Sequence, residues 1–282
     1  MAIDSIPSQS ESDAYNWGIR PWEPEGFEVV PSNFGDLTAV QELMISDCGL
    51  LTLPCSIQHL TARNTLKLQF LQHFTKFPSS FGNLKSLRKL MLDQLYPLNM
   101  LPATFGDLAM ENLTIDQCEF KELPDICSLT TLQTLDLTEV DRLEKLPINF
   151  GALSNITELK VECDYHFDHQ FGSDKFKDLP QSFGHLISLQ QLTLSNLQSI
   201  EKLPLTFGEL TMLGILIIQN CRNLKELPAT FRQLTALYQL NSRKWSRRLA
   251  SEHSRGSNAW KSVDTVGCTL SPVSKHSRAF KR

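Results

Sequence analysis

The chain has 282 residues, of which 41% are hydrophobic and 21% are charged, and its formal net charge is −4. This apolar fraction is sufficient for a packed core in one or two domains. No run approaches 18 uncharged apolar residues, and residues 1–10 lack the basic start and apolar stretch of a secretory signal. We therefore expect a cytoplasmic protein without a membrane span.

The first segment, residues 1–25, is polar and rich in serine. We expect a disordered lead that merges into a partial repeat, because so few apolar side chains cannot build a core. Trp17 or Trp22 is predicted to cover the exposed end of the core that follows.

A Leu-Pro dipeptide, or a close variant, then recurs along the chain. Its prolines are Pro31, Pro54, Pro78, Pro102, Pro124, Pro147, Pro180, Pro204 and Pro228. Seven of the eight spacings are 22 to 24 residues, and the eighth is 33. Most copies continue with Phe-Gly three residues later and with aliphatic residues at positions 6, 9, 12 and 14 after the proline. The copy that begins at Pro54 departs from this pattern, because Arg63 stands where an aliphatic residue is expected.

The pattern within each copy predicts its local structure. Two aliphatic residues separated by one position indicate a short strand with both side chains pointing inward. Proline suits the first position of a short helix, and the glycine that follows suits a left-handed residue closing that turn. One such unit cannot bury its own apolar face. We therefore predict an α/β solenoid of about nine stacked repeats, with a parallel sheet on the concave face and short helices or turns on the convex face.

In residues 26–241 this pattern resembles the leucine-rich-repeat family. The segments CRNLKELPATFRQLTAL and SLQQLTLSNLQSIEKLPLTFGEL are similar to repeats of plant disease-resistance proteins and of plant intracellular Ras-group leucine-rich-repeat proteins. The family often has asparagine where Cys48, Cys118 and Cys221 stand here, so we expect packing, rather than an asparagine ladder, to hold those turns. The resemblance implies a non-enzymatic interaction module in intracellular signalling or plant-type defence recognition. An alternative is a scaffold that binds a small GTPase or a phosphatase.

The 33-residue spacing contains an insertion at about 163–175. It gathers the potential metal ligands Cys163, Asp164, His166, Asp168 and His169. An H-x-x-H spacing occurs in some zinc sites, which gives a third hypothesis, a metal-dependent enzyme at His166 and His169. No second ligand pair lies at a suitable spacing, so we expect no bound metal. We interpret the insertion as a loop at the rim of the concave face that contacts a partner.

Other catalytic motifs are missing from the sequence. There is no G-x-S-x-G elbow, no phosphate-binding loop and no G-x-G-x-x-G fingerprint. We therefore expect neither enzymatic activity nor a cofactor. The seven cysteines do not form paired clusters, which favours a reducing compartment.

The residues that flank the strand aliphatics must point away from the core, and we predict that they bind the partner. Together with the insertion, the predicted partner-binding residues are Glu42, Met44, Asp47, Lys67, Phe70, Lys89, Asp93, Asp116, Gln117, Asp136, Glu139, Glu158, Lys160, Glu162, Tyr165, His166, Phe167, Thr193, Asn196, Gln219 and Asn220. Eight are acidic and three are lysines, so we expect a protein partner with a basic patch and no binding of nucleic acid. The sequence leaves the oligomeric state open.

The last segment reverses the charge of the rest. Residues 241–282 contain ten Lys or Arg against Glu252 and Asp264, whereas residues 1–240 carry 17 basic and 29 acidic residues. We expect residues 242–282 to be a disordered tail. It could bind anionic lipid or nucleic acid, fold back on the acidic solenoid, or have no role. The absence of aromatic interleaving and of an amphipathic period favours the last of these.

Overall fold

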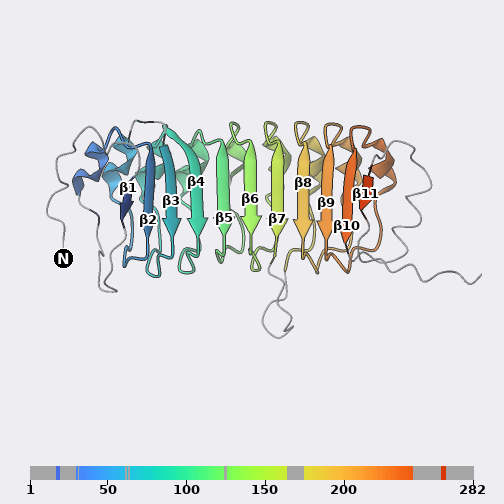
Figure 1. Cartoon of the computed structure of the whole chain (residues 1–282), viewed down its shortest axis with the longest axis horizontal. Helices are drawn as coiled ribbons and strands as arrows, with labels where there is room; N and C mark the ends of the chain where they lie inside the picture. Colours follow the sequence, from blue (N-terminus) through green and yellow to red (C-terminus); the bar gives the residue numbers. More distant parts are fainter. Residues whose placement is uncertain are drawn as a thin grey trace, which may run out of the picture.

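A computed structural model describes residues 17–19, 30, 32–60, 62, 64–123, 126–163, 175–243 and 262–264. These residues form one parallel sheet in which the strands follow each other in chain order (Figure 1). The strands are β1 Trp17–Ile19, β2 Glu42–Ser46, β3 Asn64–Gln69, β4 Leu87–Asp93, β5 Asn112–Asp116, β6 Thr134–Thr138, β7 Glu158–Glu162, β8 Gln191–Ser195, β9 Ile215–Gln219, β10 Gln239–Arg243 and β11 Ser262–Asp264. The nine predicted repeats correspond to β2 through β10.

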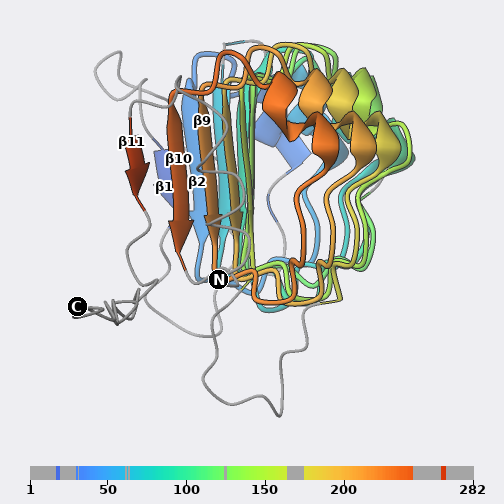
Figure 2. The ribbon, with the colours of Figure 1, turned by 90° about the vertical axis from the view of Figure 1, so that its right-hand side faces the viewer.

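Each of these nine strands is preceded by a short 3₁₀ helix. The helices are η1 Ser32–Asp36, η2 Cys55–His59, η3 Ser79–Asn83, η4 Ala103–Asp107, η5 Ile126–Ser128, η6 Phe150–Ala152, η7 Gln181–His185, η8 Leu205–Glu209 and η9 Ala229–Gln233. Figure 2 shows the helices on one side of the sheet, with the end strands β1 and β11 displaced toward the other side. The free face of the sheet is therefore concave, and the predicted solenoid architecture is confirmed.

The prolines lie one residue earlier than expected relative to the helices. Pro54, Pro78, Pro102, Pro180, Pro204 and Pro228 each precede a helix in an extended conformation, with φ from −68° to −62°. Their carbonyl groups accept the first hydrogen bond of the helix, as in Phe81 N–H to Pro78 O at 3.0 Å. Proline therefore starts the turn from the capping position, where its fixed φ suits the extended backbone.

The glycines after phenylalanine have a different role from the predicted one. Gly82, Gly184 and Gly208 do not adopt a left-handed φ. A Cβ at Gly184 would instead lie 2.2 Å from the carbonyl oxygen of Thr206 in the next repeat. Glycine is required because the helices of adjacent repeats stack with their backbones in contact. The left-handed conformation occurs directly after the strands, at Asp47, Phe70, Gln94, Gln117, Glu139, Asn196 and Asn220.

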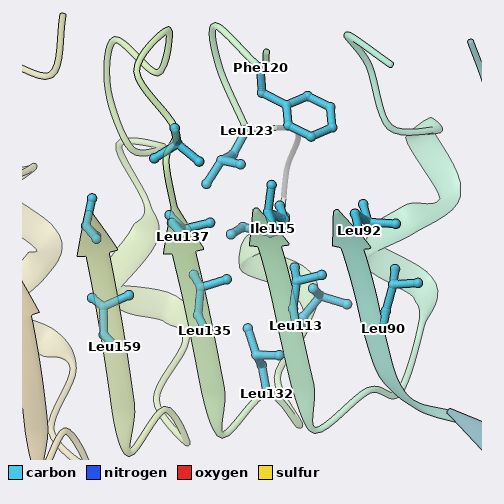
Figure 3. Close-up of a cluster of buried hydrophobic side chains, with 14 of the residues drawn as sticks. Leu90, Leu92, Leu113, Ile115, Phe120, Leu123, Leu132, Leu135, Leu137 and Leu159 are labelled. Atoms are coloured by element: carbon cyan, nitrogen blue, oxygen red, sulfur yellow. The ribbon is translucent and has the colours of Figure 1, made fainter. Parts of the chain in front are cut away.

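One continuous core lies between the sheet and the helices. Figure 3 shows leucines of neighbouring strands, such as Leu113 and Leu135, projecting to the same side of the sheet. Behind them the phenylalanines stack from repeat to repeat, and the rings of Phe183 and Phe207 lie 6.1 Å apart at 3°. Burial of these side chains across repeat boundaries is the main favourable term that holds the solenoid together.

Thiol groups stand in for the asparagine ladder at two turns. Cys118 Sγ lies 3.9 Å from Leu92 O in the preceding repeat and 3.3 Å from Asp116 O, and Cys221 makes the equivalent contacts. The S–H group is a weak donor, so it supplements the packing that we expected to act alone. Burial raises the pKa of the Cys118 thiol to about 12, which keeps it protonated as a donor.

The terminal segments lie mostly outside the described residues. Within the segments expected to be disordered, Trp17–Ile19 and Ser262–Asp264 form short strands that extend the sheet at its two ends. The expected disorder of these two segments stays a prediction. The predicted capping side chains of Trp17 and Trp22 are not among those that the structure describes.

Candidate functional site

The strand register arranges the outward side chains of the concave face in rows. Glu42 pairs with Thr65, Thr65 with Lys89, and the row continues through all the strands to β10. Adjacent parallel strands lie about 4.8 Å apart, so each side chain lies beside its counterparts in the neighbouring repeats. The charge of the face therefore depends on which residues occupy the same position in successive repeats.

The outward positions of β4 to β7 carry most of the charge. Six carboxylates lie there, at Asp93, Asp116, Asp136, Glu139, Glu158 and Glu162, against the two lysines Lys89 and Lys160. We call this set of six carboxylates the acidic face. None of them is buried, so the face presents excess negative charge to solvent.

A hydrogen-bonded network joins β6 and β7 within the acidic face. Lys160 Nζ lies 2.9 Å from Glu162 Oε2 and 3.9 Å from Asp136 Oδ1. Lys160 also donates to Thr138 Oγ1 at 2.9 Å, and Thr138 donates to Asp136 Oδ1 at 2.6 Å. Burial lowers the pKa of Lys160, but the neighbouring carboxylates outweigh it and the net change is upward. Lys160 therefore remains charged and offsets part of the negative charge.

Asp116 stands apart from this network. It pairs in register with Asp93 on β4, which places two carboxylates side by side. Its Oδ1 atom is buried and accepts no hydrogen bond from the described residues. Burial, Asp93 and Asp136 together raise the pKa of Asp116. The centre of the acidic face thus contains a carboxylate whose charge is poorly compensated.

The negative potential extends to the edge of the sheet at Tyr96. Its hydroxyl group donates to Gln117 Oε1 at 3.0 Å. Burial raises the pKa of Tyr96, and the negative charges of Glu139, Asp93 and Asp116 raise it further. Asp93 itself accepts a hydrogen bond from Gln69 Nε2 at 3.0 Å. Gln69, Tyr96 and Thr138 were not among the predicted partner-binding residues, although Gln69 and Thr138 are outward strand positions in the sequence pattern.

The outward positions of β8 and β9 have no charge. They are Gln191, Thr193, Ser195, Asn196, Ile215, Ile217, Gln219 and Asn220, and we call this set the neutral face. Asn220 Nδ2 donates to Asn196 Oδ1 at 2.7 Å, and Asn196 Nδ2 donates to Cys163 O at 2.8 Å. Asn196 is only 7% exposed, so its amide group is used within the fold.

The other predicted residues lie toward the N-terminal end of the sheet. Lys67 forms an ion pair with Glu42 at 2.5 Å, and both side chains are about one third exposed. Met44 also faces outward, and Asp47 and Phe70 follow their strands in the left-handed conformation. The predicted insertion residues Tyr165, His166 and Phe167 lie outside the described residues.

The hypothesis of a metal site receives no support from the residues that the structure describes. Among them no three His, Cys, Asp or Glu side chains are placed to hold a metal ion. His166 and His169 belong to the insertion and lie outside these residues. The expectation that the protein binds no metal or cofactor therefore remains a prediction.

A shallow groove of about 960 Å³ lies on the opposite side of the sheet, where the chain approaches η6 and η7. It is lined by residues 122–123, 144–149, 175 and 177–180, and Ile148 on its rim is 86% exposed. Lys145 forms an ion pair with Glu122 at 2.9 Å within this groove. The groove has no excess charge to select a partner, so we place the candidate site on the concave face.

Comparisons with known proteins agree with this fold. No protein-family model matches the sequence. The TMV resistance protein N of Nicotiana glutinosa is 27% identical over 206 residues, which cover 62% of this chain and 17% of that protein. The chain thus corresponds to about a sixth of the length of this relative. In the described part of the chain, no helix is long and apolar enough to cross a membrane.

Three solved structures are similar in fold. The leucine-rich-repeat domain of the type III effector XopL has a TM-score of 0.68 and 22% identity, covering 86% of this chain and 79% of that chain. An internalin from Listeria monocytogenes has a TM-score of 0.52 and 14% identity, covering 85% and 71%. Toll in its Drosophila complex with Spätzle has a TM-score of 0.54 and 18% identity, covering 77% and 29%. With nine strand-and-helix units around one leucine core, the chain has the leucine-rich-repeat solenoid fold.

Proposed function

We propose that the chain is a non-enzymatic module that binds a protein partner on its concave face, in intracellular signalling or plant-type defence recognition. The similarity to a resistance protein supports the defence role. The fold supports recognition by a rigid surface, because stacked repeats hold the outward side chains in fixed rows. Little conformational entropy is then lost when a partner binds.

The charge of the acidic face carries the proposal of a basic partner. Asp93, Asp116 and Glu158 make no ion pair with any other described residue. A partner with lysine or arginine side chains gains favourable interactions there and is steered toward the face at low ionic strength. Nucleic acid is repelled by the same charges.

The test is an affinity pull-down from a plant extract with the immobilised full chain. The triple variant Asp116→Lys, Asp136→Lys, Glu158→Lys should reduce recovery of the partner at least tenfold, because it reverses the charge of the face. Glu209→Lys reverses a single carboxylate on η8, behind the sheet, and should leave recovery unchanged. Unchanged recovery with the triple variant would show that the partner does not bind this face.

A further inference from the structure

The C-terminal residues 265–282 are basic, and their charge is opposite to that of the acidic face. Residues 265–282 contain Lys275, Arg278, Lys281 and Arg282 and no aspartate or glutamate. The acidic face carries six carboxylates, and the outward positions of β4 to β7 add the two lysines Lys89 and Lys160. The two regions have opposite charge, and both belong to the same chain.

We propose that residues 265–282 dock on the acidic face, so that the chain covers its own binding surface until a more basic partner displaces them. This inference concerns the regulation of the concave face and rests on the proposed function for its biological role. The docking itself requires only the geometry and charge of this chain.

The direction of β11 points the segment toward the correct edge of the sheet. β11 is parallel to β10, and Asp264 pairs with Asn241, so β11 stops two residues before the end of β10 and points toward the edge where the strands end. Asp93, Asp116 and Glu162 are the last residues of β4, β5 and β7 and lie at that same edge. β11 therefore points toward the edge that holds these carboxylates, and the segment begins several strands away from them along the sheet.

The length of the segment is also sufficient. Four to seven strand spacings separate β11 from β7 and β4, which amounts to about 20 to 35 Å. Residues 265–274 connect β11 to Lys275, and ten extended residues span up to about 35 Å. Lys275 and the basic residues after it can therefore reach the whole acidic face.

The receiving groups match a lysine- and arginine-rich segment. Asp116 and Asp93 lie side by side, and a guanidinium group can bridge two neighbouring carboxylates. The buried Oδ1 of Asp116 lacks a donor among the described residues. Asp136 and Glu162 already have Lys160, so docking is expected at the Asp93 and Asp116 end of the face and at Glu158.

Tethering makes this contact effective even when each ion pair is weak. A segment joined by a short linker acts at an effective concentration of about 1 mM. If the isolated segment binds with a Kd of about 0.1 mM, the tethered segment weakens any competing ligand about tenfold. The contact is electrostatic and exposed, so it should weaken strongly at high salt.

Carbodiimide cross-linking of the full chain tests the docking directly, because the reagent joins only lysine and carboxylate groups in contact. Mass spectrometry should find Lys275 or Lys281 linked to Asp93, Asp116 or Glu158. These links should persist on tenfold dilution and disappear in 0.5 M NaCl. The exposed pair Lys225 and Glu201, 2.7 Å apart, provides an internal control. Control links without tail links, or tail links equally frequent at Glu209 and Glu226, would overturn the proposal.

A competition experiment tests the same contact without lysine chemistry. A labelled peptide of residues 265–282, with Cys268→Ser, is titrated at low salt onto the unmodified chain and onto a full chain carrying Lys275→Gln, Arg278→Gln, Lys281→Gln and Arg282→Gln. Fluorescence anisotropy should show about tenfold weaker binding to the unmodified chain. Equal binding to both chains, or no binding to the substituted chain, contradicts docking.

The two proposals fail separately. Neither experiment on the tail contains a partner protein, so loss of the cross-links leaves the pull-down result intact. Conversely, the cross-links can form while the triple charge reversal leaves recovery of the partner unchanged. In that case residues 265–282 dock on the acidic face, but the proposed function is wrong.

Discussion

The acidic face and the neutral face are built on the same scaffold and differ only in the side chains that it presents. β6 and β8 both pair in register with their neighbours, and Leu135 and Leu192 beneath them are fully buried. Above the sheet, β4 to β7 carry six carboxylates, whereas β8 and β9 carry none. The same backbone can therefore change its surface charge without changing its core.

The two faces also use their polar groups differently. On the neutral face Asn196 and Asn220 bond to each other and to the backbone at Cys163. On the acidic face, Oδ1 of Asp116 lies beside Asp93 without a hydrogen-bond donor in the described part of the chain. The amide groups of the neutral face are therefore used in hydrogen bonds within the fold. The acidic face, in contrast, retains negative charge that a ligand can compensate. This difference favours β4 to β7 as the part of the sheet that selects a partner.

The largest expected effect tests whether the scaffold is the same beneath both faces. Leu135→Ala under the acidic face and Leu192→Ala under the neutral face should each lower the free energy of unfolding by about 3 kcal/mol, since both side chains are fully buried. Urea denaturation measures both, with the exposed Gln190→Ala as a control expected within about 0.5 kcal/mol of the unmodified chain. Clearly unequal losses would show that the cores differ.

A smaller effect is expected from the amides that follow the strands. Asn196 and Gln117 both have a left-handed backbone, so Asn196→Gly and Gln117→Gly change the backbone in the same way. The free energy of unfolding of Asn196→Gly should be about 1 kcal/mol lower than that of Gln117→Gly. The reason is that Asn196→Gly removes a buried amide that both donates and accepts a hydrogen bond. Gln117 loses only the bond from the exposed Tyr96. Equal stabilities in urea would mean that the hydrogen bonds of the Asn196 side chain contribute nothing to stability.

The smallest effect concerns charge repulsion on the acidic face. Asp116→Asn should raise the free energy of unfolding at pH 7 by about 0.5 kcal/mol, since like charges on neighbouring strands destabilise a sheet. Asp136→Asn provides the contrast, because Asp136 accepts a bond from Thr138 and contacts Lys160, and it should not be stabilising.

The pH dependence of the same variant checks the cause. The pKa of Asp116 is raised in the fold, so the folded state holds its proton at pH values where the unfolded state has lost it. The stability contributed by this group therefore falls as pH rises from the ordinary Asp value of about 4, and remains lower at neutral pH. The advantage of Asp116→Asn should disappear in urea titrations below that pH. An advantage that persists there would point to packing rather than charge.

Several features could not be predicted because they depend on residues in other repeats. Gly184 is a regular part of the sequence pattern. The reason why no larger residue fits there is the carbonyl oxygen of Thr206 in the next repeat, which a Cβ atom would contact too closely. The repeat that begins at Pro54 also contains a feature that the sequence pattern could not predict. Asn64 pairs with Leu87 next to a register shift and is buried, and its side-chain amide has no hydrogen-bond partner among the described residues. The sequence pattern gave no reason to place a polar group in the core.

The spacing of leucine, proline and phenylalanine by itself determined the number of repeats, the strand in each one and the side that faces the core. This information is local, because side chains alternate across a strand whatever lies beside it. Stacking alone decided which outward residues become neighbours, such as Asp93 beside Asp116 and Lys160 between Asp136 and Glu162. Those contacts join residues from different repeats, so the electrostatics of the face exists only in the assembled solenoid.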